Sequence, residues 1–122
     1  MLYERILVGT DGSSTAAKAV DRAVEIGKVT GAAVTVLHVG SGAKGEKVLQ
    51  AVASRYAGSD VAVTTEMRSG DPASVLADAA DGYDLLVVGN KGMTGAARFF
   101  LGSVPNKVSH HARLSLMIVH TT

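Results

Sequence analysis

Apolar residues along the chain follow two alternating patterns. Short runs rich in β-branched residues predict strands, and three of them are almost continuously apolar, as expected of parallel strands covered on both faces. The run over residues 61–68 alternates between apolar and polar residues, which is typical of an edge strand. The five predicted strands are Arg5–Gly9, Ala33–Val39, Val61–Arg68, Asp84–Gly89 and Ser115–His120.

Segments with helical periodicity separate these runs. Ser13 and Ser14 are residue types that cap a helix, and Pro72 is well placed at a first helical position. The expected helices run from Ser13-Ser14 to about Thr30, over Lys44–Tyr56, from Asp71-Pro72 to about Ala80, and from Gly102-Ser103 to about Ala112. The alternation predicts an α/β fold in a single domain over residues 1–122. We expect one doubly wound, five-stranded parallel sheet with four helices and strand order 3-2-1-4-5.

Composition narrows the function classes. The formal net charge is +1 and aromatic residues make up 4% of the chain, so nothing favours nucleic acid, an anionic membrane or a base-stacking platform. The absence of cysteine excludes disulfides and thiolate chemistry. No apolar run approaches the roughly 18 residues of a membrane span, and the N-terminus lacks the pattern of a secretory signal. We therefore expect a cytoplasmic protein without a membrane partner.

The segment after the fourth predicted strand carries the strongest candidate chemistry. Asn90–Leu101 is twelve residues long, which is long for a connection between a strand and a helix. Gly89 precedes it, Gly92 lies near its start, and Gly102 and Ser103 stand where the fourth helix is expected to begin. Glycines let the backbone approach a ligand closely, and a helix N-terminus presents free N–H donors to an anion. The spacing predicts a backbone cradle for phosphate.

A second group of residues follows the first and second strands. If the first and fourth strands are neighbours, their carboxyl ends form the switch point where ligands bind in such sheets. Thr10 and Asp11 would then lie near the glycine loop, with the Asp11 carboxylate accepting hydrogen bonds from ribose hydroxyls. Val39-Gly40 would present backbone groups and an apolar wall to a base. The alternative for Asp11 is that it only caps the first helix, and Ser103 is an N-cap under either interpretation.

Other polar residues point less clearly to chemistry. His110 and His111 are adjacent, so they point in different directions on a helix and are expected at the surface. His38 and His120 lie in predicted strands and are expected to serve packing or an interface. The acidic residues Asp78, Asp81 and Asp84 are typical of ordinary solvation. Motifs of P-loop enzymes and serine hydrolases are absent from the sequence, and no side chain stands out as an activated nucleophile.

These residues together resemble the universal stress protein family over nearly the whole chain. The segments that carry the resemblance are Val8–Ser13 (VGTDGS), Leu37–Val39 (LHV), Gly70–Pro72 (GDP) and Leu86–Gly89 (LVVG). The most specific pattern is G-x2-G-x9-G-S, matched at Gly89, Gly92, Gly102 and Ser103. This pattern marks the ATP-binding branch of the family.

The resemblance implies a Rossmann-like fold of the adenine nucleotide alpha hydrolase type, adenine-nucleotide binding and a regulatory role in the stress response. It also implies a homodimer formed through the last strand, ATP bound with Mg²⁺ or Mn²⁺, and slow hydrolysis at most. By match to the motif, Asp11 meets the ribose and Val39 meets the adenine through its backbone. The residues matched to the phosphates are Gly89, Gly92, Gly102, Ser103 and Val104. The implied site residues are Thr10, Asp11, Val39, Gly89, Asn90, Gly92, Gly102, Ser103, Val104 and Pro105.

Three departures from the family pattern affect the choice of nucleotide. Pro105 stands where many ATP-binding members have Ser or Thr, which removes one hydroxyl near the phosphates. The segment after the second strand is shorter than in many members, and Arg113 takes a position often held by Pro. The C-terminal region resembles small actinobacterial members, some of which bind cyclic AMP (cAMP). ATP, AMP and cAMP therefore stay open as ligands. Two alternative functions also stay open: a slow ATPase or phosphotransfer enzyme, and a scaffold whose loop binds nothing.

Overall fold

Five parallel strands form one sheet in the order β3-β2-β1-β4-β5. The computed structural model describes residues 2–90 and 114–120. Among them the elements are β1 (Arg5–Thr10), α1 (Ser14–Thr30), β2 (Ala33–Val39), α2 (Gly42–Arg55), β3 (Val63–Arg68), α3 (Pro72–Ala79), β4 (Leu85–Gly89) and β5 (Ser115–Val119). The predicted parallel sheet and its strand order are confirmed.

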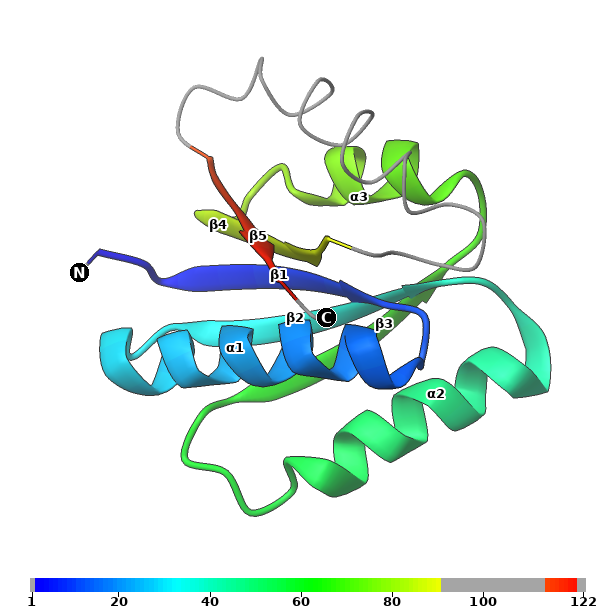
Figure 1. Ribbon diagram of the computed structural model, residues 1–122, viewed down its shortest axis with the longest axis horizontal. Coiled ribbons are helices and arrows are strands. Elements are labelled where there is room, and N and C mark those ends of the chain that lie inside the picture. Colours follow the sequence, from blue (N-terminus) through cyan, green and yellow to red (C-terminus); the bar gives the residue numbers. More distant parts are fainter. Residues whose placement is uncertain (1, 91–113, 121–122) are drawn as a thin grey trace.

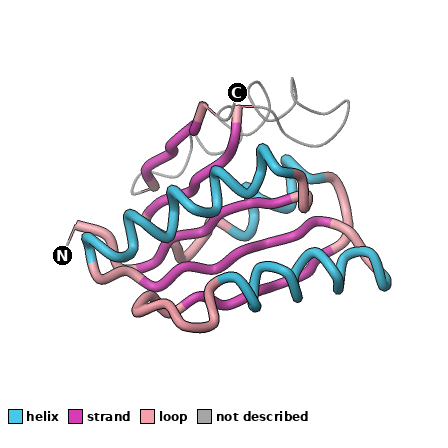
Figure 2. The backbone as a smooth tube through the Cα atoms, turned by 60° about the horizontal axis from the view of Figure 1, so that its bottom comes forward, coloured by secondary structure: helices cyan, strands magenta, loops and turns pink. Residues whose placement is uncertain are grey.

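Helices cover both faces of this sheet. Figure 1 shows α1 and α2 on one side of the strands and α3 on the other. Helix α2 lies along the β3 edge, as Figure 2 also shows. The part of the chain that the structure describes contains three helices. The fourth expected helix, from Gly102-Ser103 to about Ala112, lies outside the described residues, as does most of the loop 90–101.

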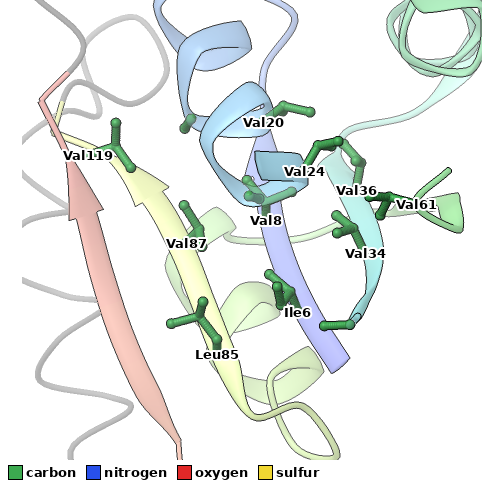
Figure 3. Close-up of a cluster of buried hydrophobic side chains, with 13 residues drawn as sticks. Ile6, Val8, Val20, Val24, Val34, Val36, Val61, Leu85, Val87 and Val119 are labelled. Atoms are coloured by element: carbon green, nitrogen blue, oxygen red, sulfur yellow. The ribbon is translucent and has the colours of Figure 1, made fainter. Parts of the chain in front are cut away.

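The central strands bury both of their faces, as their continuous apolar runs predicted. Alternate residues of a strand point to opposite faces, so each strand contributes to two separate cores. The core under α1 is drawn in Figure 3, where Ile6, Val8, Leu85 and Val87 face that helix. The core under α3 contains Leu7, Leu37, Leu76, Leu86 and Val88.

The edge position predicted for the third run is also confirmed. Strand β3 pairs with β2 alone in the described sheet, and its burial pattern is half-exposed along its length. It begins at Val63, two residues later than predicted, because the backbone before it turns. The N–H of Val61 donates to Ser59 Oγ at 3.1 Å, a local bond that replaces a ladder bond there.

Asp84 corrects the expectation of ordinary solvation for the acidic residues around the fourth strand. Its Oδ2 accepts hydrogen bonds from the backbone N–H groups of Glu4 and Arg5, each at 2.8 Å. These two bonds hold the pKa of the Asp84 carboxyl below its usual value. The guanidinium of Arg5 completes the contact by donating to the carbonyl of Gly82 at 2.9 Å and lying 4.5 Å from the centre of the Tyr83 ring. Asp84 therefore ties the start of β1 to the start of β4.

Candidate functional site

Strands β1 and β4 are neighbours, which places the reversal of strand order between them. Their register pairs Ile6 with Leu85 and Val8 with Val87. Continuing that register by two residues sets Thr10 opposite Gly89, so both strands end at the same level. Figure 1 shows the chain leaving β1 and β2 on the same side of the molecule, at the right of the view. This is the edge at which ligands bind in doubly wound sheets.

The turn over residues 10–13 after β1 is ordered by its own side chains. The hydroxyl of buried Thr10 accepts from the N–H of Gly12 at 3.1 Å, and Asp11 Oδ1 accepts from the N–H of Ser13 at 2.9 Å. Gly12 has φ of +84°, a conformation that favours glycine. The turn therefore has one well-defined shape before helix α1 begins.

The N-cap of α1 is Ser13 and not Asp11. Ser13 Oγ accepts from the N–H of Ala16 at 3.1 Å, as the side chain of an N-cap residue does. Asp11 uses one carboxylate oxygen inside the turn, and its other oxygen, Oδ2, receives no hydrogen bond from the residues the structure describes. The alternative that Asp11 only caps the helix does not fit this geometry. A half-buried carboxylate oxygen at the switch point can accept a hydroxyl donor.

The end of β2 offers no free backbone donor at Gly40. Val39 is buried in the core on the α3 side of the sheet. The N–H of Gly40 already donates to the carbonyl of Arg68 at 2.8 Å, so β3 occupies it. Val39 thus lies at the carboxyl end of β2, and β1 separates that strand from β4.

The end of β4 is tied to β5. The N–H of Asn90 donates to the carbonyl of Val119 at 2.8 Å, and its side-chain Nδ2 lies 3.4 Å from His120 Nδ1. Gly89 is half-buried and pairs with Val119. The remaining residues of the predicted cradle lie outside the described residues: Gly92, Gly102, Ser103, Val104 and Pro105.

A groove of about 260 Å³ opens between α1 and α2 beside this turn. Apolar residues line most of it, and Thr10, Gly12 and Ser13 line one end. Arg55 and Tyr56 line it as well, at the C-terminal end of α2. The groove lies on the α1 side of the sheet, the face opposite to Val39.

Asp21 of α1 joins α2 to α1 along this groove. Arg55 donates to Asp21 from Nε at 3.0 Å and from a terminal nitrogen at 2.8 Å, and the Tyr56 hydroxyl donates to the same carboxylate. Burial alone would raise the pKa of Asp21, but the hydrogen bonds from Arg55 and Tyr56 outweigh it and lower the value. Burial and the bond to Asp21 raise the pKa of Tyr56 to about 12.

Sequence reasoning missed this three-residue contact. Asp21 and Tyr56 are 35 positions apart, and each belongs to a helix that is unremarkable in sequence. The sequence also led us to expect that His38 serves packing or an interface, although its Nδ1 lies 3.0 Å from the carbonyl oxygen of Thr10. The described residues include no group of three His, Asp or Glu side chains placed to hold a metal ion, and no helix in the described ranges is long and apolar enough to cross a membrane.

Comparison with known proteins gives one family. The model of the universal stress protein family matches residues 2–45 and 40–120, two segments that meet where the connection after β2 was expected to be short. The chain is 30% identical to universal stress protein YxiE of Bacillus subtilis, with 97% of this chain and 99% of that protein covered. It is 33% identical to universal stress protein Rv1636 of Mycobacterium tuberculosis, with 98% of each covered.

Solved structures agree with this match. A universal stress protein crystallised in complex with cAMP superimposes with a TM-score of 0.81 and 33% identity, and the match covers all of both chains. The crystal structure of Rv1636 superimposes with a TM-score of 0.68 and 37% identity over all of this chain and 98% of that one.

Proposed function

Because the chain belongs to the universal stress protein family, we propose that it binds an adenine nucleotide at the carboxyl ends of β1, β2 and β4. The observation that carries this proposal is the Asp11 carboxylate at the switch point, held by the turn with Oδ2 unused among the described residues. A related protein, similar over its whole length, has been crystallised with cAMP. In the proposed complex Asp11 meets the ribose, Thr10 orders the turn and Val39 lies against the base.

The phosphate side of the site rests on the sequence motif. Gly89 and Asn90 lead from β4 into the loop, and Gly92, Gly102, Ser103 and Val104 complete the proposed cradle with Pro105 beyond them. Backbone N–H groups at a helix N-terminus suit phosphate oxygens. The substitution Gly102→Val should weaken nucleotide binding far more than it weakens folding.

Calorimetric titration of the purified protein with cAMP, AMP and ATP tests the proposal. We expect heat of binding with at least one of them. A hydrogen bond to a charged acceptor contributes roughly 1.5–3 kcal/mol, so Asp11→Ala should weaken binding roughly tenfold to a hundredfold. Asp60→Ala, which removes an exposed carboxylate at the opposite ends of the strands, is the matched control. Absence of binding with all three nucleotides would overturn the proposal.

The choice between cAMP and ATP depends on the number of phosphates that the loop holds. The motif favours ATP, with Mg²⁺ or Mn²⁺ carried on its phosphates. Pro105 and the cAMP complex of the relative favour the cyclic monophosphate, which needs fewer donors. The 3′-oxygen of cAMP is esterified, so its 2′-hydroxyl alone is left to donate to Asp11. If cAMP is the ligand, 2′-deoxy-cAMP should bind the wild-type protein about as weakly as cAMP binds the Asp11→Ala variant.

We also propose a regulatory role, which the family resemblance implies. In this proposal the protein is cytoplasmic and forms a homodimer through β5. Its partners respond to the bound nucleotide during stress. Sedimentation of the protein with and without nucleotide tests the dimer. Release of ADP from ATP that stops in Ser103→Ala would instead favour a slow ATPase.

A further inference from the structure

The imidazole of His38 reaches the turn that carries Asp11. His38 lies on β2 opposite Thr10 of β1, and its side chain is 8% exposed. Its Nδ1 lies 3.0 Å from the carbonyl oxygen of Thr10. Because a carbonyl oxygen accepts and does not donate, Nδ1 is the donor in this bond. No other side chain from a different element hydrogen-bonds to residues 10–13 within the described ranges.

Two glycines hold the imidazole in this position. A Cβ at Gly40 would lie 2.5 Å from His38 Nε2, and a Cβ at Gly45 would lie 3.1 Å from His38 Cδ2. Contacts as short as 2.5 Å do not occur between real atoms of this kind, so the ring fills the space that the two glycines leave. The absence of a side chain at Gly40 and Gly45 therefore leaves room for the ring in the position where it bonds to Thr10.

Helix α2 supports the same turn from a second direction. A Cβ at Gly12 would lie 2.7 Å from Cγ2 of Val48, so the side chain of Val48 rests directly on the turn. Gly45, one helical turn earlier, rests on His38. Three kinds of contact therefore stabilise the turn over residues 10–13: its own hydrogen bonds, the hydrogen bond from His38, and packing against helix α2.

We propose that His38 is a positioning residue of the nucleotide site, which sets the orientation of Asp11 through its hydrogen bond to the Thr10 carbonyl. The effect of His38 on nucleotide affinity rests on the proposed function. The effect of His38 on the turn rests on the described contacts alone. The imidazole itself does not touch the ligand in this scheme.

Two substitutions of His38, with one control, test whether the hydrogen-bond donor or the bulk of the ring orders the turn. His38→Asn keeps an N–H donor at the same distance from Cβ as Nδ1, whereas His38→Leu fills the space without a donor. Val24→Ala is the control, because it removes buried volume from the core under α1 at a site in the middle of that helix, away from residues 10–13.

The first measurement is amide hydrogen exchange of the nucleotide-free protein. The N–H groups of Gly12 and Ser13 report directly on the turn, since Thr10 Oγ1 and Asp11 Oδ1 accept from them. Loss of one hydrogen bond changes the equilibrium constant for opening of the turn by roughly threefold to tenfold. His38→Leu should therefore speed exchange of these two N–H groups by about that factor relative to Val24→Ala. His38→Asn should stay within about twofold of wild type. Equal exchange in the Leu and Asn variants would overturn the positioning role.

The second measurement is nucleotide affinity. His38→Leu should weaken binding by the same roughly threefold to tenfold, and His38→Asn should restore it. In the Asp11→Ala background the His38→Leu change should have little further effect, because it acts through Asp11. Full additivity of the two changes would overturn the inference. A wild-type protein that binds no adenine nucleotide would refute the proposed function, while the exchange result would still decide the role of His38 in the turn.

Discussion

Replacing Asp84 tests how the two halves of the sheet are joined. The Asp84→Ala variant removes the carboxylate that accepts from Glu4 and Arg5, both at 2.8 Å. Hydrogen bonds to a charged acceptor contribute roughly 1.5–3 kcal/mol each when buried. Asp84 is half-exposed, so water compensates part of the loss, and we expect the free energy of unfolding to fall by about 2 kcal/mol in total. For a chain of this length that corresponds to a melting temperature lowered by roughly 6–10 °C.

The pH dependence follows from the direction of the pKa shift. The pKa of Asp84 is lowered from 3.8 in the folded protein, so the unfolded chain takes up the proton first on acidification. The stabilisation by Asp84 is therefore complete well above pH 3.8 and is lost as the pH falls through the lower folded-state pKa. The difference between wild type and Asp84→Ala should be full at neutral pH and shrink below pH 3.8.

Urea denaturation at neutral and at acidic pH measures both effects. Asp84→Asn keeps one carbonyl acceptor and should lose less stability than Asp84→Ala. Asp60→Ala removes an exposed carboxylate at the same end of the sheet and serves as the control. An Asp84→Ala variant as stable as the control at neutral pH, or a stability deficit that does not change on acidification, would refute this role of Asp84.

Three further changes probe the packing around the candidate site. Leu76→Ala empties a position that is 1% exposed in the α3 core, and urea denaturation should show a loss of about 2–5 kcal/mol; a loss below about 1 kcal/mol would contradict that packing. Tyr56→Phe removes the hydroxyl that donates to Asp21, and chemical denaturation should show a loss of about 1 kcal/mol; unchanged stability would mean that this bond contributes nothing. Gly45→Ala places a Cβ 2.4 Å from Met67 Sδ, and thermal melting should show a destabilisation of about 1–3 kcal/mol that shrinks when Met67→Ala is combined with it; strict additivity would refute that contact.

Local patterns in the sequence predicted the elements of the fold well. The apolar runs became β1, β2 and β4, which are buried on both faces. Ser13 became the N-cap of α1, and Asp71 caps α3 with Pro72 at its first turn. These features depend on residues within a few positions of one another, so the order of residues alone carries the information.

Contacts between distant segments could not be predicted in the same way. The Asp84 carboxylate meets backbone groups about 80 positions away, whereas the sequence predicted only ordinary solvation for Asp84 at the start of its strand. Asp21 and Tyr56 meet because α1 and α2 cover the same face of the sheet. Neither pair has a sequence signal, since the spacing of such partners depends on the packing of whole elements.

The sequence by itself determined the alternation of strands and helices, the two-sided burial of the central strands, and the polar residues at strand ends that suggest a nucleotide. Those properties follow from residue type and period along a single segment. Tertiary structure decided which residues share the site. It placed His38 against the Thr10 carbonyl and left one oxygen of Asp11 without a partner among the described residues. The physical reason is that hydrogen bonds and close packing depend on distances of a few ångströms between elements, which residue order does not specify.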